Sequence, residues 1–110
     1  MWDKLTNLQS LIKQAAELGK QAEHIRGELR TKTVEASVGG GMVTVRANGL
    51  ADVISISIDP SLLVPEEREM VQELVAAAVN EAAHKARELA RQELSALTGG
   101  IDVAGMMGMS

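Results

Sequence analysis

From residue 8 to residue 29, apolar side chains recur at alternating intervals of three and four residues. They are Leu8, Leu11, Ala15, Leu18, Ala22, Ile25 and Leu29. This spacing places all of them on one side of an α-helix, as in the seam of a coiled coil. The sequence therefore predicts one long N-terminal helix. Gly19 and Gly27 fall inside it but off the seam, and each lowers helix stability by about 1 kcal/mol relative to alanine.

Short segments rich in branched side chains follow this helix, and they predict strands. The segments are Thr33 to Val38, Met42 to Asn48, and Ala51 to Ile58, which ends in alternating isoleucines at 54, 56 and 58. Gly39-Gly40-Gly41 separates the first two segments, and Asn48-Gly49 begins the turn between the second and the third. Because these residues accept positive φ in tight hairpins, we expect a three-stranded antiparallel meander.

A second long helix is predicted to run from about residue 65 to about Leu97. Asp59-Pro60-Ser61 ends the last strand, and Pro65-Glu66-Glu67 places a proline and two carboxylates at the start of the helix, where its dipole is positive. The part from Met70 to Val79 is apolar over a broad arc, so we expect it to cover the sheet. Beyond Asn80 only a narrow apolar stripe remains, and we expect that part to protrude.

These elements predict a single α+β domain, helix–strand–strand–strand–helix (α-β-β-β-α), over residues 1–97, with a flexible Gly/Met-rich tail over residues 98–110. No Phe or Tyr is present, so the core is expected to be thin. The absence of cysteine excludes disulfides and thiolate metal sites and fits a reducing compartment, with the cytoplasm as the default. Nothing approaches the roughly 20 consecutive apolar residues of a membrane helix.

The predicted elements differ in length in a way that favours self-association. A helix of about 27 residues is ~40 Å long, whereas strands of six to eight residues span about 20–27 Å. The helices must therefore overhang the sheet, and each CH₂ left in water forfeits roughly 0.8 kcal/mol. Two helices of one chain could cover each other only in part, so we expect a homodimer.

The connected features resemble the YbaB/EbfC family of bacterial nucleoid-associated proteins over nearly the whole chain. The segments that carry the resemblance are Ile58-Asp59-Pro60-Ser61-Leu62-Leu63, Leu74-Val75-Ala76-Ala77-Ala78-Val79-Asn80-Glu81-Ala82, Gly40-Gly41-Met42-Val43-Thr44-Val45, Asn48-Gly49 and the Gly/Met-rich tail. The resemblance implies an intertwined homodimer whose projecting helices act as tweezers on double-stranded DNA with little sequence preference. It also implies a nucleoid location and effects on nucleoid organisation and gene expression.

Basic residues on the two helices are the candidate DNA contacts. Lys13 and Lys20 lie seven residues apart and share an outward helical face, with Arg26, Arg30 and Lys32 continuing toward the sheet; Lys85, Arg87 and Arg91 lie on the second helix. The alternative interpretation is that these charges only solvate exposed helices. The net charge of −4 argues against a wholly basic surface. No zinc-ligand spacing, helix-turn-helix signature or RNA-binding aromatic motif is present, so we expect contacts to the phosphate backbone.

Other functions find less support in the residues. An adaptor that docks a partner protein through the helix seam or the Met106-Met107-Met109 tail is the main alternative, and the net negative charge favours it. The spacing Glu81-x-x-His84 could hold two metal ligands, but a di-metal centre also needs carboxylates from other helices. Gly39-Gly40-Gly41 lacks the Lys-Ser/Thr of a phosphate loop. We therefore expect no catalysis, no cofactor, no metal, no membrane partner and no small-molecule substrate.

Overall fold

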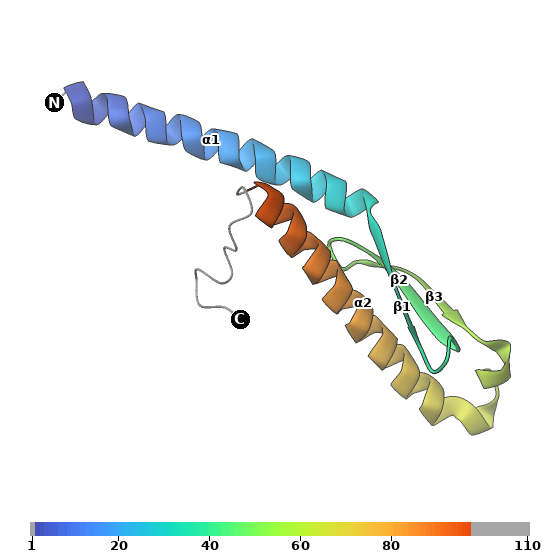
Figure 1. Cartoon of the computed structure of the whole chain (residues 1–110). Helices are drawn as coiled ribbons and strands as arrows, with labels where there is room; N and C mark the ends of the chain where they lie inside the picture. Colours follow the sequence, from blue (N-terminus) through green and yellow to red (C-terminus); the bar gives the residue numbers. More distant parts are fainter. Residues whose placement is uncertain (1, 98–110) are drawn as a thin grey trace.

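The computed structural model describes the backbone of residues 2–97 and the side chains of residues 6–96 (Figure 1). The elements are α1 (Trp2–Thr31), β1 (Thr33–Val38), β2 (Val43–Asn48), β3 (Val53–Ile58), two short 3₁₀ turns, η1 (Pro60–Leu62) and η2 (Pro65–Glu67), and α2 (Arg68–Leu97). This order confirms the predicted α-β-β-β-α fold. The predicted tail, residues 98–110, lies outside the described residues.

The three strands form an antiparallel sheet in the order β1-β2-β3, which confirms the predicted meander. Val45 at the middle of β2 stands opposite Ala36 of β1 and Ile56 of β3. An irregularity between Arg46 and Ala47 shifts the β2–β3 register near the turn. The bend that such a bulge introduces changes the course of the strand at this end of the sheet.

The two hairpin turns differ in how they use glycine. Gly39, Gly40 and Gly41 all have positive φ, as predicted. In the β2–β3 turn the positive φ falls on Ala51 instead of Gly49, which corrects the prediction. The Asn48 side chain explains the difference, because its Oδ1 accepts hydrogen bonds from the backbone N–H of Leu50 and Asp52 and holds a longer turn together.

The segment after β3 turns sharply because Asp59 caps it. Its Oδ1 accepts hydrogen bonds from the Ser61 backbone N–H at 2.9 Å and from the Ser61 hydroxyl at 2.7 Å. These two donors, the hydroxyl first, lower the pKa of the Asp59 carboxyl from its usual value. Pro65-Glu66-Glu67 forms a 3₁₀ turn before α2, so the α-helix begins three residues later than the sequence predicted.

Helix α2 lies over β1 and β2 and forms the core with them (Figure 1). Ala78, Ala82 and Ala86 are fully buried against Val43 and Val45. The prediction that α2 protrudes beyond Asn80 is therefore wrong. Alanines four residues apart form a flat row with short side chains, so the helix stays close to the sheet for two turns more than the narrowing of its apolar arc indicated.

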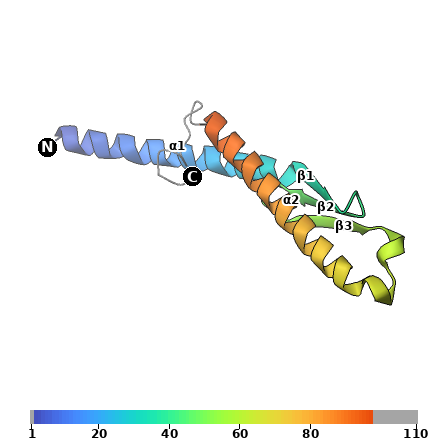
Figure 2. The same cartoon turned by 60° about the horizontal axis from the view of Figure 1, so that its bottom comes forward.

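Helix α1 does not flank the sheet along its length, contrary to the prediction. It contacts the rest of the molecule at its C-terminal end, where Ile25 and Leu29 are buried. The N–H of Gly49 donates to the carbonyl oxygens of Leu29 at 2.8 Å and Lys32 at 3.0 Å. The β2–β3 turn thereby satisfies carbonyls that the end of a helix leaves without an intrahelical partner. The remainder of α1 projects as an arm, as Figures 1 and 2 show from two directions.

The arm makes the molecule very elongated. Its extents are 75 × 26 × 19 Å and its radius of gyration is 20.5 Å, whereas a compact chain of this length has a radius of about 13 Å. Within residues 2–97, neither long helix contains a stretch apolar enough to cross a membrane.

Candidate nucleic-acid interface

Lys13 and Lys20 lie on the projecting part of α1, and both side chains are exposed. Their seven-residue spacing places them on one face, nearly opposite the apolar seam, because a helix completes almost two turns in seven residues. Glu17 lies close to this face, with its Oε1 at 3.9 Å from the Lys20 ammonium. An ion pair this exposed is worth little. The Lys20 charge is therefore still available to a phosphate group.

Arg26 and Arg30 are also exposed, but they form a second face of α1. Arg26 comes six residues after Lys20 in a continuous helix, which rotates it by about a third of a turn. The cations of α1 thus occupy two faces, one far out on the arm and one near its base. A single straight phosphate backbone cannot follow both.

Lys32 lies just after α1 and joins its base to the far end of α2. Its ammonium forms an ion pair with the carboxylate of Glu93. The hydrogen bond to Glu93 raises the pKa of Lys32 above its usual value. Lys32 is therefore already engaged in holding the two helices together.

The basic residues of α2 are also engaged within the protein, at least in part. The Lys85 ammonium donates to the backbone carbonyl of Glu35 at 2.8 Å, on the outer edge of β1. Nη2 of Arg91 lies 3.0 Å from Oε2 of Glu88, one helical turn away. Arg87 is exposed between them in sequence. These three residues lie on the body of the molecule, away from the projecting half of α1.

Two further exposed arginines were not predicted as candidates. Arg46 points from β2 to the face of the sheet opposite α2, in register with Glu35 and Ser55. The alternation with the inward-facing Val45 and Ala47 is the sequence signal that could have found it. Arg68 is exposed at the first residue of α2.

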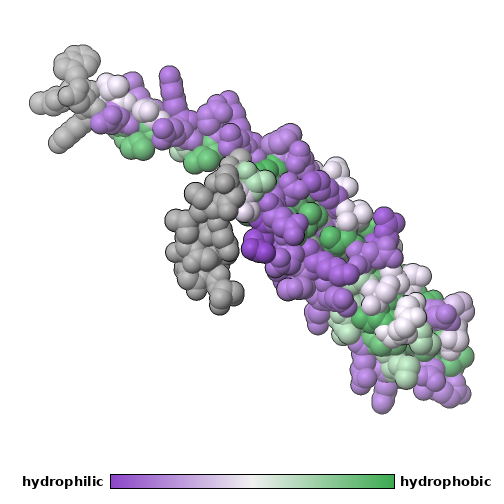
Figure 3. Space-filling view, in the orientation of Figure 1, coloured by the Kyte–Doolittle hydropathy of each residue, from purple (hydrophilic) through white to green (hydrophobic). Residues whose placement is uncertain are grey.

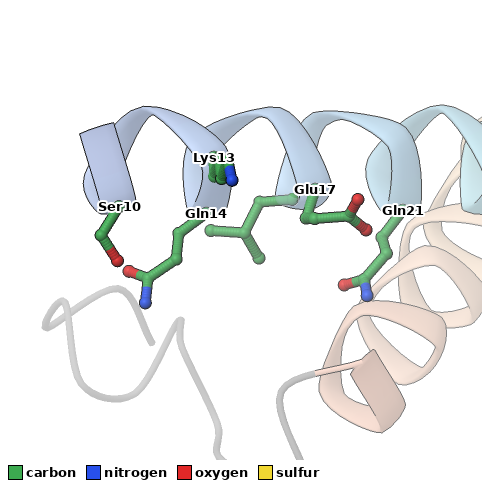
Figure 4. Close-up of a pocket in the computed structure, with 6 residues that line it drawn as sticks. Ser10, Lys13, Gln14, Glu17 and Gln21 are labelled. Carbon is green, nitrogen blue, oxygen red and sulfur yellow. The ribbon is translucent and has the colours of Figure 1, made fainter. Parts of the chain in front are cut away.

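Few other features of the described residues could carry chemistry. Glu81 and His84 are both exposed on α2. No group of three or more His, Asp or Glu side chains in the described part of the chain is placed to hold a metal ion. A hollow runs along α1 beside Leu18 (Figure 4). Its lining residues are Ser10, Lys13, Gln14, Glu17, Leu18 and Gln21.

An exposed helical arm with basic side chains, mounted on a small α+β body, defines a class of binding protein that meets its ligand through surface charge. Comparison with known proteins specifies that class. The model of the YbaB/EbfC DNA-binding family matches residues 4–101, and the chain belongs to this family.

Relatives in other organisms agree. A nucleoid-associated protein of Acetivibrio thermocellus is 47% identical over 95 residues, covering 86% of this chain and 84% of the relative. One from Clostridium novyi is 43% identical over 100 residues, covering 91% and 88%. The crystal structure of an uncharacterized protein from Helicobacter pylori matches with a TM-score of 0.62 at 28% identity, over 74% of this chain and 93% of that one.

Proposed function

We propose that this protein binds double-stranded DNA as a homodimer, through phosphate contacts of the basic residues on its projecting helix, in the cytoplasmic nucleoid. The observation that carries the proposal is the arm itself. Lys13 and Lys20 are exposed on a part of α1 that extends clear of the body, where a duplex can reach them. Membership of the YbaB/EbfC DNA-binding family supports DNA as the ligand.

Strand β3 supports the homodimer. It pairs only with β2 among the described strands and lies at the edge of the sheet, largely beyond the cover of α2. Val53, Ile54 and Ile56 are exposed along it. An exposed edge strand with apolar side chains is a ready template for pairing with another chain. We propose that β3 of two copies meet and bury these side chains.

Little sequence preference follows from the kind of side chains on the arm. Lysine reaches phosphates as a flexible point charge, and phosphate contacts carry no direct sequence information. Binding of this kind would affect nucleoid organisation and gene expression by occupying many sites on the chromosome.

The test is a salt-titrated anisotropy assay with unrelated duplexes. Each neutralised phosphate contributes about −0.9 to the slope of log affinity against log salt, so a few contacts per subunit give a slope of roughly −3 to −6. Lys13→Ala with Lys20→Ala should weaken binding equally for all duplexes and flatten the slope by about 0.9 for each lost contact.

Arg46→Ala with Arg68→Ala is the matched control, since it removes two positive charges elsewhere on the surface. This control should retain most of the affinity. Equal losses in both variants would mean that net charge alone governs binding and that the arm has no special role. No binding of any duplex at low salt would contradict the proposal and favour the adaptor function instead.

A further inference from the structure

The outer half of α1 carries an apolar stripe that the protein itself leaves exposed. Leu8, Leu11 and Leu18 are exposed by 54%, 61% and 59%. The same repeat continues into Ile25 and Leu29, which are buried at the base of the arm. One helical seam is thus covered by the body at its C-terminal end and uncovered over the residues before it. Figure 3 shows the uncovered part as hydrophobic patches along one side of an otherwise hydrophilic helix.

The borders of this stripe carry no charge. Ile12 and Gly19 lie on one side of the seam, and Gln14 and Gln21 lie on the other. Ile12 is itself 61% exposed, so it widens the apolar surface. Gln14 and Gln21 line the hollow beside Leu18 (Figure 4). In a coiled coil the border positions set partner choice through their charges. Here they would not repel an identical copy of the same surface.

We propose that the stripe is the contact surface for α1 of a second copy of this chain, packed antiparallel. In this pairing Leu8 of each helix lies opposite Leu18 of the other, and Leu11 lies opposite Ala15. Large residues meet small ones at the centre and leucines meet at both ends. The contact is isologous, because each copy supplies the same patch and a two-fold axis closes it.

The buried base of the arm decides the direction of pairing. In a parallel pair the second helix would run beside Ile25 and Leu29, where the protein's own body already lies. In the antiparallel pair the overlap ends near Ala22, before that region begins. Antiparallel helices also place their dipoles in opposite directions. The boundary between the exposed and the buried seam residues therefore coincides with the end of the proposed contact.

This contact is separate from the β3 edge and does not depend on DNA binding. If β3 forms the dimer, pairing of the arms joins dimers into tetramers or longer assemblies. If it does not, the arms alone form the dimer. In both cases, removing the stripe must reduce the mass of the particle.

The test is sedimentation velocity of the full chain and of Leu11→Gln with Leu18→Gln, over a wide range of protein concentration. The substitutions keep the net charge and the helix propensity nearly unchanged, and circular dichroism would verify the fold. We expect the variant to lose the largest species of the wild type and to show half its mass. Ala16→Gln, an exposed substitution on α1 away from the seam, should behave as the wild type.

Equal masses for the wild type and the double variant at every concentration would overturn the inference. A second measurement fixes the direction of the pair. The chain has no cysteine, so Ile12→Cys provides a single thiol. In the antiparallel pair the two copies of residue 12 lie close together across the two-fold axis, and oxidation should link two chains. Linkage by Leu8→Cys instead would contradict the antiparallel arrangement. Unchanged affinity of Leu11→Gln with Leu18→Gln for a single duplex at low protein concentration would show that DNA binding is independent of the pairing.

Discussion

Gly49 lies where the β2–β3 turn meets the end of α1, and its place there depends on the absence of a side chain. Its backbone N–H reaches the carbonyl oxygen of Leu29 at 2.8 Å. A Cβ at this position would stand 2.8 Å from Leu29 Cδ2 and 2.9 Å from that carbonyl oxygen. The glycine is thus needed for a close approach of two backbones.

We predict that Gly49→Ala destabilises the protein by about 1–3 kcal/mol, as overpacking of a tight site does. The matched control is Gly27→Ala within α1, where an added Cβ would meet no described atom within 4 Å. That substitution should stabilise the protein by up to about 1 kcal/mol, because alanine favours the helix. Urea unfolding of both variants checks the pair. Equal effects of the same sign would contradict the proposed role of Gly49.

Two lysines show what the sequence could not reveal about the candidate site. Lys32 and Lys85 were predicted as DNA contacts from their charge and helical position. In the structure Lys32 pairs with Glu93, and Lys85 donates to the carbonyl oxygen of Glu35. Both partners are at least fifty residues away in sequence, so only the tertiary fold brings them together. Lys13 and Lys20 stay exposed as predicted, and whether they contact DNA stays a prediction.

At the scale of elements, local patterns were sufficient for the order of helices and strands but not for their packing. The seam of α1, the alternating isoleucines of β3 and the Gly39–Gly41 turn were each recognised from spacing and residue type. The extent of contact between α2 and the sheet was misjudged, because the narrowing apolar arc after Asn80 hid a row of alanines. Alanine contributes little to a hydrophobic pattern, yet Ala82 and Ala86 are fully buried.

We predict that Ala82→Leu destabilises the protein by about 1–3 kcal/mol, because no space exists for a larger side chain between α2 and the sheet. Ala77→Leu is the control, since Ala77 is exposed on the same helix, and its effect should stay within about 0.5 kcal/mol. Thermal unfolding compares the two. A stable Ala82→Leu variant would mean that α2 can shift away from β1 and β2 at little cost.

At the scale of the whole molecule, the projecting arm separates two surfaces of α1. The apolar stripe and the Lys13–Lys20 face point in nearly opposite directions around the same helix. If two arms pair through their stripes, the lysines of each copy face outward, on opposite sides of the pair. One assembly would then present basic faces to two different duplexes.

We therefore predict that the protein bridges DNA and that bridging requires the stripe. An immobilised duplex should capture a second, labelled duplex in the presence of the wild-type protein, and rising salt should release it because phosphate contacts weaken. Leu11→Gln with Leu18→Gln should lose most of the capture while still binding one duplex, since it retains Lys13 and Lys20. Lys13→Ala with Lys20→Ala should lose both activities. Bridging by the leucine variant at the wild-type level would show that another surface, such as the β3 edge, holds the two DNA-binding faces apart.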